Sequence, residues 1–124
     1  MSDPIQDLAL ALRAFAQARQ WGPFHSPKNL ASALSVEAAE LLEHFQWLTE
    51  AQSRSLSDEQ REAVALEMAD VLLYLLQLAD HTGVDLRDAV ERKLVKNAIK
   101  HPVPLAGPAS ADGPQPGSTH SGVL

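Results

Sequence analysis

Two short acidic steps are the residues of this sequence that are best suited to chemistry. Glu37 and Glu40 stand three residues apart, and Glu67 and Asp70 repeat this spacing after an interval of 26 residues. On an α-helix, residues three apart lie on the same face, so each step presents two carboxylates together, with Glu43 at the flank of the first. If the two helices are antiparallel neighbours, the four carboxylates converge. Like charges held so closely are costly unless they are protonated, paired or bound to a cation, so the pattern predicts a metal site.

A hard divalent cation is the metal that such a site would take. Ligands that are all oxygen atoms favour Mg²⁺, or Mn²⁺, over zinc. Cysteine is absent, which excludes thiolate nucleophiles and Cys-ligated metal centres. A di-iron bundle would need two Glu-x-x-His steps, and the sequence has none. Two simpler interpretations stay open: a solvated helix face for Glu37, Glu40 and Glu43, and buried pairing with Lys or Arg for Glu67 and Asp70.

The segment that carries the second acidic step is apolar almost all the way round. Twelve apolar residues lie between Val64 and Ala79, both included. A helix without a polar face is buried, either within a bundle or against another subunit. The remaining side chains form one polar stripe at i, i+3, i+7 and i+10, which consists of Glu67, Asp70, Tyr74 and Gln77.

Capping and stop signals divide the first 101 residues into four helical segments. Asp3 before Pro4 and Ser26 before Pro27 place a capping residue ahead of a proline, which is favoured at the first helical position. Ser57 with Gln60 matches the capping-box pattern. The predicted segments run from Asp3 to the Trp21-Gly22-Pro23 break, from Ser26 to about residue 50, from Ser57 to Gly83, and from Asp85 to Pro102. Amphipathic helices joined by short links predict an all-α fold, a four-helix antiparallel bundle.

Length and composition agree with a single helical domain. Of the 124 residues, 45% are hydrophobic but only 5% are aromatic, and Ala and Leu predominate, which favours helices over an all-β fold. Five Pro and four Gly among the last 23 residues predict a disordered tail (102–124) after a helical domain (1–101). A net charge of −6 disfavours nucleic acid and anionic membranes as partners. Without cysteine, a secretory signal or a membrane span, the chain is expected to be cytoplasmic.

The acidic steps and the motifs around them resemble one known family. Glu37-Ala38-Ala39-Glu40 and Glu67-Met68-Ala69-Asp70 resemble the ExxE and ExxD motifs of the all-α nucleoside triphosphate pyrophosphohydrolases, the MazG-like superfamily. Four further segments resemble the dCTP pyrophosphatase branch: Trp21 to Leu30 (WGPFHSPKNL), Glu43 to Trp47 (EHFQW), Asp70 to Leu75 (DVLLYL) and Lys93 to Pro102. The resemblance covers about residues 5–102.

The resemblance implies hydrolysis of a nucleoside triphosphate between its α- and β-phosphates, with dCTP or a modified dCTP as substrate and a role in cleaning the nucleotide pool. It implies that Glu37, Glu40, Glu67 and Asp70 are catalytic and hold Mg²⁺, which lets an acidic pocket accept a polyphosphate and activates a water. Glu40 is our candidate for the base that orients this water. Two alternatives stay open: the same scaffold acting on dUTP or a broad set of triphosphates, and a non-catalytic helical module whose acidic stripes only specify oligomer register.

The resemblance also implies substrate-binding residues. His25, Trp47 and Tyr74 match positions near the base and sugar, where an indole can stack on a nucleobase. Their structural alternatives are core packing for Trp47 and Tyr74 and a loop cap for His25.

A second set of binding residues is expected near the phosphates. The matching residues at the end of the last predicted helix are Lys93, Lys96, Asn97 and Lys100, for which a solvated charged face is the alternative. Val95, Ile99 and His101 depart from the family's pattern, which leaves the contacts at this end open.

A homo-oligomer is the expected assembly. A bundle made from one chain would leave part of the apolar segment 64–79 exposed. Family members form dimers or dimers of dimers with sites at subunit contacts, so we expect a dimer or a tetramer.

Overall fold

The computed structural model describes residues 3–105, and every regular element in that range is a helix, which confirms the predicted all-α class. The elements are α1 (Pro4–Ala18), the 3₁₀ turn η1 (Gly22–Phe24), α2 (Pro27–Glu43), α3 (Glu50–Ser53), α4 (Asp58–Thr82) and α5 (Leu86–Lys100). None of these helices is long and apolar enough to cross a bilayer. The chain forms two compact units, one up to Asp85 and one from Leu86 onward, which are described separately. The tail predicted for 102–124 lies outside the described residues from 106 onward.

The predicted helix starts are confirmed by their capping hydrogen bonds. The side chains of Asp3 and Ser26 accept from the backbone amides of Ile5 and Asn29, at 3.0 and 3.1 Å. At the start of α4, the Ser57 hydroxyl accepts from the Gln60 amide at 3.1 Å, and the Gln60 side chain accepts from the Ser57 amide at 2.9 Å. These bonds satisfy amide groups that a helix start otherwise leaves without a partner.

The second helix is shorter than predicted. It ends at Glu43 instead of near residue 50, and the chain passes through turns to the one-turn helix α3. A second capping box explains the interruption, because the Thr49 hydroxyl accepts from the Gln52 amide and the Gln52 side chain accepts from the Thr49 amide. Thr49 therefore begins a new helix instead of continuing the old one.

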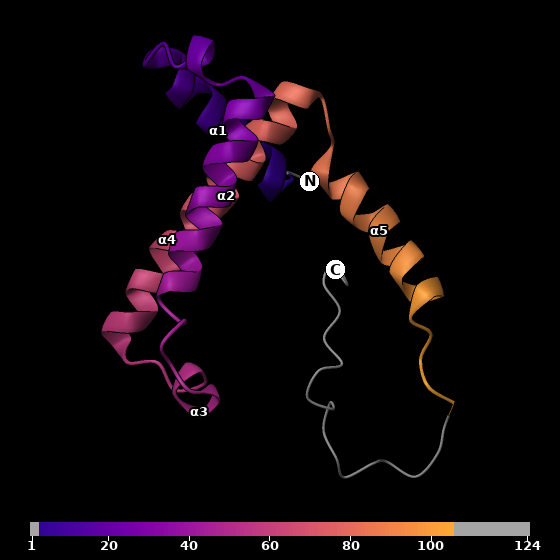
Figure 1. The fold of residues 1–124 in the computed structure, drawn as a ribbon. Coiled ribbons are helices and arrows are strands. Elements are labelled where there is room, and N and C mark those ends of the chain that lie inside the picture. The colour runs from indigo at the N-terminus through magenta and orange to yellow at the C-terminus, as the bar shows by residue number, and fades with distance from the viewer. Residues whose placement is uncertain (1–2, 106–124) are drawn as a thin grey trace. The chain divides into compact units, whose positions relative to one another are not determined.

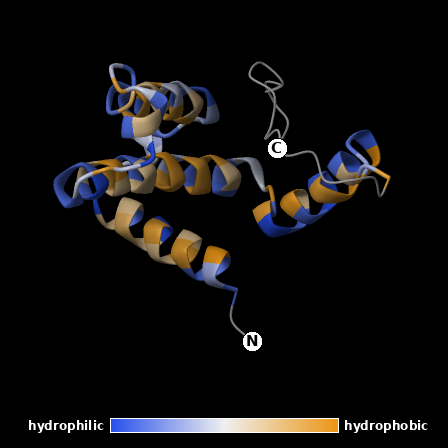
Figure 2. Cartoon of the chain, turned by 90° about the horizontal axis from the view of Figure 1, so that it is seen from below, coloured by the Kyte–Doolittle hydropathy of each residue, from blue (hydrophilic) through white to orange (hydrophobic). Residues whose placement is uncertain are grey.

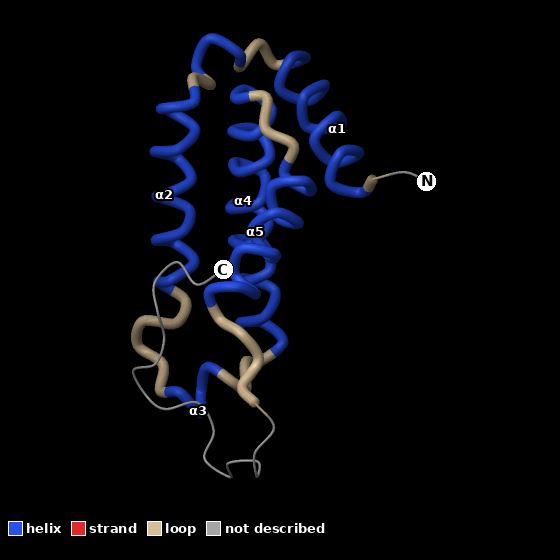
Figure 3. The backbone as a smooth tube through the Cα atoms, turned by 90° about the vertical axis from the view of Figure 1, so that its right-hand side faces the viewer, coloured by secondary structure: helices blue, strands red, loops and turns tan. Residues whose placement is uncertain are grey.

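Helices α2 and α4 form an antiparallel hairpin with α3 at its closed end, and α1 packs against α4 (Figures 1 and 3). Hydrophobic and hydrophilic residues alternate along the helices (Figure 2). The buried apolar side chains among the described residues are Leu30, Val64, Leu76 and Ala79. A two-point ion pair between Arg13 of α1 and Asp80 of α4 adds to the contact between these helices, with Arg13 Nε 3.1 Å from Asp80 Oδ2.

Gly83 ends α4 in the left-handed conformation, with φ at +69°. A Cβ atom added there would meet nothing within 4 Å, so the only penalty for Gly83→Ala is the backbone conformation itself. We expect Gly83→Ala to lower the free energy of unfolding by about 1 kcal/mol in urea denaturation. Gly83→Asn is the matched control and should lose less, because Asn tolerates this conformation better than Ala. Equal losses in both variants would contradict this explanation.

Candidate metal and nucleotide site

Three carboxylates from two helices meet between α2 and α4. Glu37 of α2 and Glu67 and Asp70 of α4 each offer one oxygen, and these oxygens all lie within 4.8 Å of one another. Glu40, one helical turn after Glu37, shares a hydrogen bond with the Glu37 side chain. The antiparallel pairing of α2 with α4 therefore brings the two acidic steps together.

Glu37 carries the electrostatic signature of this arrangement. Its pKa is raised from 4.5 to about 7, first by burial, then by the hydrogen bond and charge of Glu40, and finally by the charges of the two acidic residues on α4. Each of these causes disfavours the ionised form. When protonated, Glu37 can donate its hydrogen bond to the Glu40 carboxylate, which relieves part of the repulsion.

The surroundings of the four carboxylates within residues 3–105 hold little positive charge. Within the described residues, no Lys or Arg forms an ion pair with any of the four acids, and the one basic contact is His44 Nε2 at 3.7 Å from Glu67 Oε1. Oxygen Oε2 of Glu37 and Oε2 of Glu67 are buried and have no hydrogen-bond partner among the described residues. Buried carboxylate oxygens that lack a donor are suited to a hard divalent cation, so the residues present fit Mg²⁺ or Mn²⁺. Among residues 3–105, no Lys or Arg contact supports the alternative interpretation that Glu67 and Asp70 are paired with a basic side chain.

An aromatic cavity of about 220 Å³ begins beside Asp70. It lies within the first unit, between α1, the η1 loop and α4, and its lining consists of Leu12, Phe15, Trp21, His25, Asp70, Leu73, Tyr74 and Gln77. The polar stripe of α4 thus continues from the acidic cluster along one wall of the cavity. Its flat aromatic groups suit a planar ring.

Local contacts hold the loop that supplies the opposite wall. The Trp21 amide donates to the Ala16 carbonyl at 3.1 Å, and the Trp21 ring lies 5.5 Å from Phe15 and 5.7 Å from His25, centroid to centroid. Side-chain Nδ2 of Asn29 donates to the Phe24 carbonyl at 3.2 Å. The segment from Trp21 to Ser26 is therefore a folded loop that positions His25, and Asn29 ties it to the first turn of α2.

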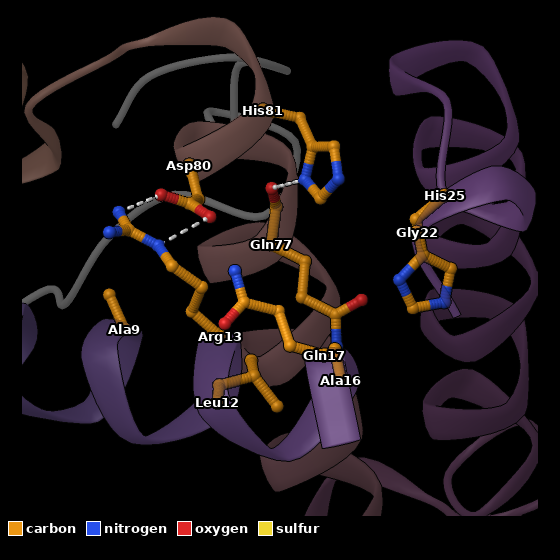
Figure 4. A pocket seen from close by; sticks show the side chains of 10 residues that line it. All are labelled: Ala9, Leu12, Arg13, Ala16, Gln17, Gly22, His25, Gln77, Asp80 and His81. Carbon is orange, nitrogen blue, oxygen red and sulfur yellow. Dashed lines mark hydrogen bonds and ion pairs between the residues drawn. The ribbon is translucent and has the colours of Figure 1, made fainter. Parts of the chain in front are cut away.

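A second cavity of about 180 Å³ adjoins the first and shares Leu12, His25 and Gln77 with it (Figure 4). The ion pair between Arg13 and Asp80 lies on its wall. The cavity system therefore extends along α4 for about three helical turns, from Asp70 to His81.

The structure brings some of the predicted binding residues together and leaves others apart. His25 and Tyr74 both line the aromatic cavity. Trp47 follows α2 and is 85% exposed, so within one chain it reaches no cavity described above. The basic and amide residues predicted near the phosphates, Lys93, Lys96, Asn97 and Lys100, lie on α5 in the second unit, and their role stays a prediction.

Sequence reasoning assigned no role to three residues that line or touch this site. Trp21 lines the cavity, although only its neighbour His25 in the same motif was singled out. Gln77 is the last residue of the polar stripe on α4. Its place in a cavity wall depends on α1, which packs beside it. His44 caps the end of α2 in helical conformation, and its Nε2 lies 3.7 Å from Glu67 Oε1. Helical spacing signals both Gln77 and His44, because His44 follows Glu37 by seven residues and Glu40 by four and so shares their face of the helix.

Comparison with known proteins identifies the class that this all-α fold and acidic cluster define. The model of the MazG-like family matches residues 32–111, and the chain belongs to this family. It is 39% identical over 104 residues to dCTP pyrophosphatase 1 of Rattus norvegicus, covering 82% of this chain and 61% of the relative. It is likewise 39% identical over 108 residues to dCTP pyrophosphatase 1 of Homo sapiens, covering 86% and 64%. The chain thus spans about three fifths of the length of these curated relatives.

A solved structure agrees with this assignment. The crystal structure of a pyrophosphatase from Archaeoglobus fulgidus superposes on this chain with a TM-score of 0.77 at 39% sequence identity. The match covers 83% of this chain and 96% of that one.

The raised pKa of Glu37 makes the stability of the metal-free protein depend on pH. Because the folded protein holds a proton near pH 7 that the unfolded chain releases near 4.5, this residue destabilises the fold progressively as the pH rises through that interval. We expect Glu37→Gln, measured by urea unfolding in EDTA, to stabilise the protein by about 1 to 3 kcal/mol at pH 8 and far less at pH 5.

Glu43→Gln is the control, since Glu43 is exposed at the end of the same helix. Its effect should be small and the same at both pH values. A Glu37→Gln effect that does not change with pH would contradict the electrostatic account.

Proposed function

We propose that this chain is a nucleoside triphosphate pyrophosphohydrolase that depends on Mg²⁺ or Mn²⁺ and acts on a deoxynucleoside triphosphate, dCTP or a modified dCTP, in the cytoplasm. In the reaction, water hydrolyses the bond between the α- and β-phosphates, so that the triphosphate becomes the monophosphate and pyrophosphate. The curated relatives carry the name dCTP pyrophosphatase 1, and the similar archaeal structure is described as a pyrophosphatase, which supports this assignment.

The observation that carries the proposal is the trio of carboxylate oxygens within 4.8 Å beside an aromatic cavity. Three acids from two helices, without a Lys or Arg partner in the described residues, are expensive to hold together for a purely structural purpose. Asp70 belongs both to the trio and to the cavity wall. A ligand with a polyphosphate at one end and a planar ring at the other matches this pairing of sites.

Glu37, Glu67 and Asp70 would hold the metal, each through one oxygen. Mg²⁺, when bound, supplies positive charge that lets the acidic cluster accept the triphosphate, and it polarises the phosphoryl oxygens and the attacking water. Glu40 is linked to the trio through Glu37 and is the candidate for the base that orients the water and takes its proton.

The base and sugar would occupy the aromatic cavity. Tyr74 and Gln77 follow Asp70 by four and seven residues on α4, which places Gln77 about 10 Å along the helix axis from Asp70. That separation is on the scale of a nucleotide, from its phosphate to the far edge of its base. Trp21 and His25 would contact the ring from the η1 loop. Lys93, Lys96, Asn97 and Lys100 of α5 are proposed to approach the phosphates, as the family resemblance implies.

Self-association is part of the proposal. Large apolar side chains are exposed on the central helix, including Leu66 at 60% and Met68 at 56%, which flank Glu67 directly. A second copy that covers this surface would also shield the acidic cluster from water and so strengthen its electrostatic interactions. We propose a dimer or a tetramer, in which Trp47 contacts the base at a subunit contact.

Removing one carboxylate of the trio should abolish catalysis without unfolding the protein. We expect Glu67→Gln and Asp70→Asn to lower pyrophosphate release from dCTP with Mg²⁺ by at least about a hundredfold, because each loses a charged metal ligand. Mg²⁺ should raise the melting temperature of the wild type but not that of the variants. Glu62→Gln, at an exposed position of the same helix, is the control and should retain activity.

Two results would contradict the enzyme assignment. Orthophosphate as the sole product would indicate a phosphatase. Unchanged melting in Mg²⁺, together with stabilisation by Glu67→Gln, would indicate the non-catalytic helical module. Pyrophosphate release from dUTP or from many triphosphates alike would instead broaden the substrate set on the same scaffold.

The exposed apolar surface predicts an assembly larger than one 13.4 kDa chain. Light scattering at micromolar concentration should report a mass at least twice that value, and Met68→Lys should reduce it because a charge would be buried in the contact. Glu62→Lys on the same helix is the matched control and should leave the mass unchanged. A single 13.4 kDa species for the wild type would overturn the proposed assembly.

A further inference from the structure

Gln77 is a buried polar residue without a full set of partners. The residue is 9% exposed, and its side-chain oxygen Oε1 is buried with no hydrogen-bond partner in the part of the chain that the structure describes. A buried acceptor that lacks a donor is destabilising, so its presence calls for an explanation. Gln77 lies in the wall of both cavities, where a ligand could supply the missing donor.

A second polar atom that needs a partner belongs to His25, in the same cavity walls. Nitrogen Nδ1 of His25 is also buried and finds no hydrogen-bond partner within residues 3–105, and His25 lines the same two cavities as Gln77. Figure 4 shows the oxygen of the Gln77 amide pointing toward the His25 ring. Burial, and then the charge of His81, lower the pKa of His25 and favour its neutral ring. In the tautomer that carries the ring proton on Nε2, Nδ1 is an acceptor.

Gln77 Oε1 and His25 Nδ1 together define which chemical group of a ligand would satisfy both of them. Two acceptors that face one space are satisfied together by one nitrogen that carries two N–H donors. With the ring proton of His25 on Nε2, a carbonyl oxygen in that place would be a third acceptor and would leave all three without a donor. The aromatic rings of Phe15 and Trp21 beside them suit a planar group, so the donor is an amino group attached to a flat ring.

We propose that Gln77 Oε1 and His25 Nδ1 accept the two N–H bonds of the exocyclic amino group of the substrate's base. In this arrangement His25 carries its ring proton on Nε2. The pair selects an amino-bearing base such as cytosine over its keto counterpart uracil. This inference rests on the proposed function, because it assigns the base to the cavity beside the acidic cluster.

The test compares dCTP with dUTP, which share the ring size, sugar and triphosphate but differ in the group at this position. The wild type with Mg²⁺ should release pyrophosphate from dCTP with a kcat/KM on the order of tenfold higher than from dUTP. Gln77→Met keeps the length of the side chain and removes the acceptor, and it should lower the dCTP to dUTP ratio about tenfold, chiefly through dCTP. His25→Phe keeps a ring against Trp21 and should act in the same direction.

Gln17→Met is the matched control, since Gln17 lines the second cavity but not the aromatic one. It should leave the ratio unchanged. Melting temperatures show whether each variant is folded, and the wild-type ratio tests the proposal even if a variant does not fold.

The outcomes separate the two proposals. A wild type that releases pyrophosphate equally from dCTP and dUTP, or a folded Gln77→Met that lowers both alike, overturns the assignment of Gln77 and His25 while the pyrophosphohydrolase stands. A wild type that releases pyrophosphate from neither substrate removes both proposals.

Discussion

Repulsion among carboxylates on two packed helices is the constraint on which the site depends. Glu37, Glu67 and Asp70 present oxygens within 4.8 Å of one another, and Glu40 adds its charge to that of Glu37. The cost of ionising Glu37 among these neighbours appears as a pKa raised to about 7. Such a cluster persists only where the helices that carry it are held by other interactions, and here the antiparallel packing of α2 on α4 and the capping boxes at Thr49 and Ser57 supply them.

Helix α4 connects the acidic cluster to the cavities because its polar residues follow one stripe. Asp70 borders both sites, and Gln77 lies two turns further along in the cavity walls. The opposite walls come from α1 and the η1 loop, which are positioned by the ion pair of Arg13 with Asp80 and by the contacts of Trp21 with its neighbours. A metal-binding end and a ring-binding end are therefore parts of one scaffold, and each depends on the same helix.

The chain encloses little apolar surface, and this affects how well the scaffold keeps water away from the site. Among the described residues only a few apolar side chains are fully enclosed, while large ones such as Leu66 and Met68 are more than half exposed beside the acidic cluster. Apolar surface beside a charged site excludes water only when something covers it, and water screens the charges otherwise. Trp47, at 85% exposure, also needs a covering partner, because an indole that lies in solvent forms no pocket by itself.

Much of the fold and half of the site could be predicted from local signals in the sequence. Caps at Asp3, Ser26 and Ser57, the glycine stop at Gly83 and the three-residue spacing of the acids act within a few residues of one another, so they were readable without a structure. The early end of α2 was missed because the Thr49 capping box competes with helical periodicity. Tertiary packing alone decided that Gln77 and His25 line one cavity and that His44 approaches Glu67, because contacts between distant segments leave no periodic pattern in the chain.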